Sequence, residues 1–178
     1  MRNRILLVFA VVVALVVGVG VHSVDFHGSV PEFVRLSGGG VLLDAKPAFS
    51  EDAVYERLSG YGEDGRRNYA YRNRTVDVLL PLAVFPALFL FMLHALDGFS
   101  PSRATRAVLY SIPLLYVLFD LAENAAVLTL LSAYPARLPS TAAVLPYLTV
   151  IKRLASLLSL AIPLVLFVIA LVRRRSRA

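Results

Sequence analysis

Four long apolar runs constrain the fold of this chain more than any other feature of its sequence. Each run approaches or exceeds the ~20 residues that an α-helix needs to cross the hydrocarbon core of a bilayer. The runs cover residues 5–21, 76–96, 107–131 and 145–172. Backbone polar groups inside a bilayer must be satisfied within their own segment, so each run is expected to be a helix. The sequence therefore predicts an all-α membrane protein, residues 1–178, folded as a single four-transmembrane-helix bundle.

The composition excludes several classes of function. With 58% hydrophobic and 17% charged residues, the chain departs from soluble globular proteins. It has no cysteine, which rules out disulfides and thiolate metal sites. His22 and His27 lie near the outer end of the first run and His94 near the inner end of the second, so three histidines do not converge and we expect no metal site. The glycines at 38–40 lack the flanking strand and helix of a phosphate loop, and we expect no cofactor.

Arginines beside the apolar runs predict the topology. They are Arg2 and Arg4 before the first run, Arg103 and Arg106 between the second and third, and Arg173, Arg174, Arg175 and Arg177 after the fourth. By the positive-inside rule these regions are cytoplasmic, so both termini lie inside and residues 22–75 form an outer loop of about 50 residues. The basic flanks favour contact with membrane lipids over nucleic acid. We expect the protein in the inner (plasma) membrane of a prokaryote.

The first run has two interpretations. A basic start followed by an apolar segment is typical of a secretory signal, and Val21-His22-Ser23 offers a possible cleavage site. The apolar run reaches Val21, however, and is longer than most signals. This length favours a retained anchor helix, although cleavage stays open.

The outer loop contains signals for a short helix. Ser50 is suited to cap a helix over residues 51–58, with acidic residues in its first turn and Gly60 and Gly62 after it. From residue 63 no helix breaker follows Gly65, which predicts a helix that continues into the second membrane span.

Other outer-loop residues are assigned by their polarity. Residues 41–43 are apolar and indicate either a short strand or an apolar segment tucked at the interface. Four aromatic and basic side chains before the second span are expected to anchor the helix at the outer interface. They are Tyr69, Tyr71, Arg72 and Arg74.

Three polar residues interrupt the third apolar run. Asp120, Glu123 and Asn124 are spaced i, i+3, i+4, which places them on one helix face. A carboxyl group at the centre of a membrane helix costs roughly 2.5–3.5 kcal/mol on insertion scales. Two acids at this depth therefore indicate a partner or a function.

The fourth run carries the expected partner. With a rise of 1.5 Å per residue, Glu123 lies about 12 Å below the outer end of its helix and Lys152 about 10 Å below the outer end of the next. This depth match predicts a Lys152–Glu123 pair, with Arg153 as an alternative partner for Asp120 or for headgroups. Ser156 and Ser159 continue the face of Lys152, Tyr116 extends the acidic face, and Asp77 and Tyr147 are placed at the upper rim. The predicted ligand-binding residues are Asp120, Glu123, Asn124, Lys152, Ser156, Tyr116 and Asp77.

This polar face has two interpretations: a structural ion-pair network, or a pocket that opens outward. For a pocket, we expect binding of a lipid-like small molecule or of a partner subunit in a homo- or hetero-oligomer. The alternative is an intramembrane acid/base enzyme, isomerase-like or hydrolase-like, with Glu123 and Asp120 as candidate catalytic residues. An ion pathway is less favoured because the inner half of the third and fourth helices is mostly apolar.

Four segments carry a resemblance to known sequences. They are SEDAVYERL at 50–58, GRRNYAYRNRTVDVLLPL at 65–82, DLAEN at 120–124 and the lysine of TVIKR at 149–153. Together they resemble a pattern in uncharacterised bacterial four-helix integral membrane proteins, which implies the fold but no assigned activity. The layout alone is similar to claudin-like tetraspans, whose Trp and paired Cys this chain lacks. Emopamil-binding-protein-type sterol isomerases are similar only in placing acids and an asparagine within a membrane bundle.

Overall fold

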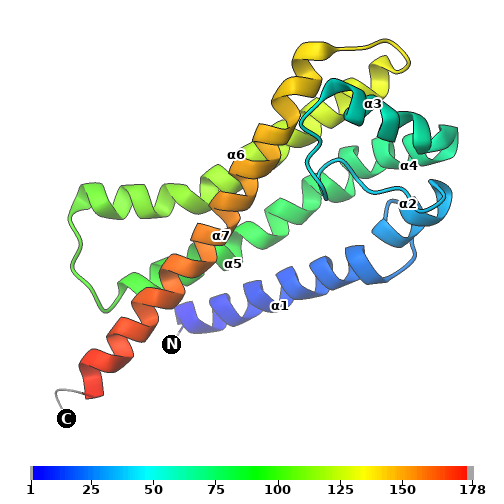
Figure 1. Ribbon diagram of the computed structural model, residues 1–178. Coiled ribbons are helices and arrows are strands. Elements are labelled where there is room, and N and C mark those ends of the chain that lie inside the picture. The colour runs from blue at the N-terminus through cyan, green and yellow to red at the C-terminus, as the bar shows by residue number, and fades with distance from the viewer. Residues whose placement is uncertain (1, 176–178) are drawn as a thin grey trace.

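The computed structural model describes the backbone of residues 2–175 and the side chains of residues 4–173. All regular structure in this part of the chain is helical (Figure 1). Its helices are α1 Arg2–Ser23, α2 Val30–Leu36, α3 Glu51–Gly60, α4 Gly62–Arg74, α5 Val76–Leu96, α6 Arg103–Ala133 and α7 Pro139–Arg175.

Four of the described segments are long and apolar enough to cross a membrane. They are Arg4–Ser23, Gly62–Leu96, Arg103–Ala133 and Pro139–Arg173. Large apolar side chains on them face outward, as Phe9 at 67% and Leu157 at 60% exposure illustrate. Such exposure suits lipid and not water. The expected all-helical fold is confirmed for the described residues, and so is the expectation of four helices long and apolar enough to span a membrane.

Helix α5 is the centre of the bundle. It contacts α1, α6 and α7, while α6 and α7 form the most extensive helix pair. Helix α1 lies along α5 at the edge of the bundle (Figure 1). Helices α2, α3 and α4 gather at one end, opposite the two chain ends, and we call this group the cap.

Two spanning helices extend beyond their apolar runs. Helix α6 begins at Arg103, where the Ser102 hydroxyl accepts a hydrogen bond from the Thr105 N–H at 3.1 Å. Helix α7 begins at Pro139, before the apolar run at 145. Hydrophobicity locates only the part of a helix inside the hydrocarbon, and polar residues continue the same helix through the interface.

The expected continuous helix into the second span is interrupted at Thr75. This residue has φ −123° and ψ −78°, outside the helical region, and separates α4 from α5. Its hydroxyl donates to the Tyr71 carbonyl at 2.8 Å. The expectation of an unbroken helix is wrong, because the backbone leaves the helical region at Thr75.

The cap shares a hydrophobic core with the neighbouring ends of α6 and α7. Phe33, Val54 and Leu58 are fully buried and pack with residues at the ends of α6 and α7, among them Val127 and Leu145. The cap is thereby attached to the bundle by apolar contact. Full burial of a side chain of this size contributes ~1.5–3 kcal/mol.

Helix α2 and the apolar stretch at residues 41–43 are two local features of the cap region that the sequence left unpredicted or undecided. Helix α2 was not expected; its N-cap is Ser29, whose hydroxyl accepts a hydrogen bond from the Glu32 N–H at 3.2 Å. Leu42 and Leu43 lie in a non-helical segment and are 5% and 1% exposed, so this stretch is an apolar tuck and not a strand. The two leucines belong to the hydrophobic core that Phe33, Val54 and Leu58 also form.

Candidate functional site

Lys152 on α7 contacts two acids on α6. Its Nζ lies 3.0 Å from Asp120 Oδ1 and forms a second ion pair with Glu123 Oε2. The two acids are less than one helical turn apart, and the Glu123 side chain is fully buried. The predicted Lys152–Glu123 pair is thus present, and the same lysine also serves Asp120.

Asn124 connects this ion pair to α5. Its Nδ2 donates to the Asp77 carbonyl at 2.8 Å and to Asp120 Oδ2 at 3.3 Å. Both partners are acceptors, so only the amide nitrogen can face them. Asn124 therefore holds the Asp120 carboxylate in orientation and fixes α6 against the start of α5.

Thr149 completes the contacts of Glu123. This fully buried residue lies on α7, one turn before Lys152, and its hydroxyl is in hydrogen-bond contact with Glu123 Oε1. The hydroxyl also lies 3.1 Å from the Leu145 carbonyl. Sequence reasoning missed Thr149, although its i−3 spacing from Lys152 places it on the same face.

A third buried ion pair, between Arg72 and Asp77, adjoins the two ion pairs of Lys152. Arg72 Nη2 on α4 lies 2.6 Å from Asp77 Oδ1 on α5, with the two side chains 2% and 8% exposed. Arg72 Nη1 also donates to the Gly28 carbonyl at 3.1 Å. The expectation that Arg72 anchors the helix at the membrane interface is wrong, because its side chain is buried inside the protein.

Seven residues thus form what we call the intramembrane polar network. They are Arg72, Asp77, Asp120, Glu123, Asn124, Thr149 and Lys152. Three carboxyl groups face two basic groups in this set. Within this network of described residues, Asp77 Oδ2 and Arg72 Nε are buried with no hydrogen-bond partner.

The cap closes over one side of the network. Arg153 donates to the Asp44 and Ala45 carbonyls at 2.8 and 2.7 Å, and the Tyr69 hydroxyl donates to Asp44 Oδ1 at 2.6 Å. Arg153 therefore binds the segment before α3. The sequence had left open a pair between Arg153 and Asp120, and the structure does not form it. Asp44 lies close enough to act electrostatically on Asp120 and on Lys152.

The two serines expected to extend the face of Lys152 lie along α7. Ser159 is fully buried and donates its hydroxyl to the Ala155 carbonyl of its own helix at 2.7 Å. Ser156 is half-buried, one turn from Lys152, and its hydroxyl makes no hydrogen bond to another described residue. Neither serine hydroxyl makes a hydrogen bond to the network.

The two predicted tyrosines lie in different surroundings. Tyr116 is buried and packs with Leu88 and Ala155 in an apolar cluster below the network. Tyr147 is 62% exposed and packs edge-on against Phe49, so it forms no rim of the network. On α7, Lys152 thus points towards the network, whereas Tyr147 points to the outer surface.

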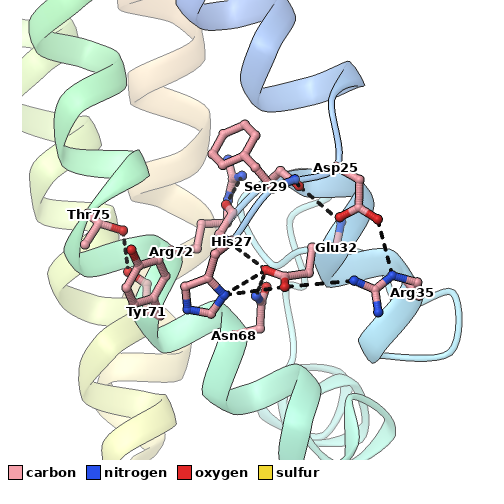
Figure 2. Close-up of polar contacts among 11 residues, drawn as sticks. Asp25, His27, Ser29, Glu32, Arg35, Asn68, Tyr71, Arg72 and Thr75 are labelled. Carbon is pink, nitrogen blue, oxygen red and sulfur yellow. Dashed lines mark hydrogen bonds and ion pairs between the residues drawn. The ribbon is translucent and has the colours of Figure 1, made fainter.

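A second polar cluster lies in the cap (Figure 2). The Glu32 carboxylate accepts hydrogen bonds from the Gly28 N–H at 2.8 Å and from Asn68 on α4, and His27 Nδ1 lies 3.2 Å away. Burial raises the pKa of Glu32, but the contacts from Gly28, His27 and Asn68 outweigh burial and hold the pKa below its usual value of 4.5. This cluster joins α2 to α4.

Among residues 4–173 no group of three or more His, Cys, Asp or Glu side chains is arranged to hold a metal ion. Comparisons with protein-family models, with curated proteins and with solved structures found no match. The chemistry of the polar network is thus the basis for a functional proposal.

Proposed function

We propose that this integral membrane protein binds a lipid-like small molecule at the intramembrane polar network. The unpartnered Asp77 Oδ2 and Arg72 Nε carry this proposal. Leaving a buried polar group without a partner costs ~1–3 kcal/mol. A ligand headgroup with a hydroxyl supplies one donor and one acceptor, which complements both atoms.

The charge of the network supports a ligand that donates hydrogen bonds. Asp77, Asp120 and Glu123 together exceed the two cations by one acid. A hydroxyl or amine headgroup complements this excess, whereas an anionic headgroup opposes it. The proposed ligand is therefore an amphiphile with a hydroxyl- or amine-bearing headgroup.

Exposure indicates the side from which a ligand approaches. The side chains of Lys152 and Asp120 are 14% and 11% exposed, in contrast to the fully buried Glu123. Nearby α7 residues such as Leu157 face outward. An amphiphile therefore reaches the network at Lys152 and Asp120, with its apolar part on the outer surface of the bundle.

The proposed function also includes the membrane in which the protein lies and its orientation there. We assign the protein to the plasma membrane of a prokaryote, with both termini in the cytoplasm and the cap outside. Arg103 and Arg106, at the end opposite the cap, support this orientation through the positive-inside rule.

Asp120→Asn is the variant that tests ligand binding. It removes the excess acid while Lys152 keeps Glu123 as its partner, so we expect the fold to persist. Asp64→Asn, on the exposed surface of α4, is the matched control. Native mass spectrometry from mild detergent is expected to show a bound amphiphile in the wild type and control, reduced roughly tenfold in Asp120→Asn.

Two results oppose this proposal. No copurified molecule, together with no thermal stabilisation by added hydroxyl- or amine-bearing amphiphiles, contradicts it. A copurified polypeptide, or a second copy of the chain lost only in Asp120→Asn, assigns the network to a subunit interface instead.

The alternative function is acid/base catalysis on a lipid or amphiphile. The observation that favours it is the lysine shared by Asp120 and Glu123, because one carboxyl beside a lysine can exchange protons with a bound substrate. Glu123→Gln then abolishes turnover of an amphiphile that the wild type converts, with thermal unfolding unchanged. Loss of the fold in Glu123→Gln points to a structural network.

A further inference from the structure

A shallow surface hollow lies away from the polar network, where the cap meets the bundle. It has a volume of about 540 Å³ and opens to the surface. We call it the interface hollow; its lining residues are Arg74, Leu128, Thr129, Ser132, Ala133 and Leu138. Arg74 ends the polar helix α4 and Val76 begins the apolar helix α5, so the hollow lies at the level where headgroups meet hydrocarbon.

Arg74 supplies the positive charge of the hollow. Its side chain is exposed and, among the described residues, no acid pairs with it. Arg67 on the same helix, by contrast, is paired with Glu63 at 2.8 Å. A free guanidinium offers a planar set of donors that matches the oxygens of a phosphate.

Two hydroxyl groups lie beside this arginine. Thr129 and Ser132 are three residues apart on α6, which places them on the same side of the helix. Thr129 donates its hydroxyl to the Ala125 carbonyl at 2.8 Å, and both Thr129 and Ser132 are exposed. The Ser132 hydroxyl can donate to a phosphate oxygen or a headgroup hydroxyl.

An apolar track leads from the hollow into the membrane. Below Thr129, the same α6 face carries Ala125, Ala122, Leu118 and Leu115, at helical spacing, and all of them are exposed. Small residues followed by leucines leave a shallow path for an acyl chain. A soluble phosphate has no apolar part to contact this track, whereas the acyl chain of a phospholipid can cover it.

We propose that the interface hollow binds an anionic phospholipid from the leaflet on the cap side. Its phosphate lies against Arg74, its headgroup contacts Ser132, and one acyl chain follows the α6 track. This site is separate from the polar network and does not depend on the proposed function.

The test compares Arg74→Gln with Arg67→Gln, which makes the same charge change on α4 outside the hollow. Each protein is reconstituted in phosphatidylcholine nanodiscs with or without phosphatidylglycerol, and retained lipid is counted by native mass spectrometry after mild detergent extraction. We expect retained phosphatidylglycerol, and its effect on thermal unfolding, in the wild type and in Arg67→Gln. Arg74→Gln is expected to bind it roughly tenfold more weakly, as the loss of a charge-assisted hydrogen bond implies.

Two outcomes overturn the proposal. Equal retention of phosphatidylglycerol by Arg74→Gln and Arg67→Gln contradicts the proposal that Arg74 binds the lipid phosphate. Thermal stabilisation by inorganic phosphate at the same concentration, equal to that by phosphatidylglycerol, assigns the hollow to a free anion. Leu118→Asn gives an independent check, because a polar residue on the track is expected to lower lipid retention while leaving Arg74 in place.

Discussion

Arg72 and Asp77 form a buried ion pair across the helix break at Thr75, with Nη2 and Oδ1 2.6 Å apart. In a continuous helix, residues five apart point about 140° away from each other. The break at Thr75 removes this separation and turns the two side chains together. Because Arg72 also bonds the Gly28 carbonyl, this pair connects the cap to the membrane bundle.

Arg72→Met is expected to destabilise the protein by ~3–5 kcal/mol, because it leaves the Asp77 carboxylate buried without a cation. Asp77→Asn in the same chain removes the stranded charge, so the double variant is expected to recover part of the loss. Thermal unfolding in detergent, followed by circular dichroism, measures both. A double variant that is less stable than Arg72→Met contradicts the pair as described.

Lys152→Met is expected to be more damaging than Glu123→Gln. The methionine leaves two facing carboxyl groups without their cation, whereas the glutamine leaves a balanced Lys152–Asp120 pair. Unfolding by titration with a denaturing detergent is expected to give a gap of ~2 kcal/mol or more between the two. Leu157→Ala, on the outward surface of α7, serves as the control and is expected to remain near the wild type.

Thr149→Val tests the hydroxyl that contacts Glu123. The two side chains have similar shapes, so the change removes the donor and leaves a buried carboxylate oxygen less satisfied. We expect a loss of ~1–3 kcal/mol in the free energy of unfolding. Thr149→Ser restores the donor and is expected to regain most of this loss; equal destabilisation by serine and valine indicates packing as the cause.

Glu32 predicts how the cap responds to acid. Its folded pKa lies below the usual value of 4.5, so its ionised form stabilises the cap at pH above 4.5 and this contribution is lost as the pH falls through the folded pKa. Glu32→Gln is expected to reduce the protection of α2 at neutral pH by roughly 1–2 kcal/mol, with a difference from the wild type that shrinks in acid.

Hydrogen–deuterium exchange over Val30–Leu36, corrected for intrinsic exchange rates, measures this effect. Glu63→Gln, on the exposed side of α4, is the control and is expected to leave α2 unchanged. A difference between Glu32→Gln and the wild type that persists unchanged below the folded pKa is inconsistent with the carboxylate as the cause.

Arg153→Met is expected to loosen the segment that covers the polar network. Arg153 donates to the carbonyls of Asp44 and Ala45, and methionine keeps the apolar stem of the side chain but has no donors. Faster deuterium uptake around residues 42–48, with α6 unchanged, is the expected result. Uptake that rises equally in α6 means that Arg153 supports the bundle as a whole.

The sequence predicted only part of the intramembrane polar network. The i, i+3, i+4 spacing placed Asp120, Glu123 and Asn124 on one face, and helix rise alone placed Lys152 at the depth of Glu123. Arg72 was misassigned because its burial depends on the break at Thr75, which propensity did not indicate. Thr149 was missed because a single hydroxyl on an apolar helix has many local uses.

The sequence by itself determined the helical class and the four spanning segments, because both follow from the length and period of apolar runs in a solvent without hydrogen-bond partners. Only the tertiary structure decided that Lys152 is shared by two acids, that Arg72 turns inward, and that α2, α3 and α4 form a cap. Those features depend on which helices meet and at what rotation. Packing between segments distant in the chain sets these relationships, and no local pattern encodes them.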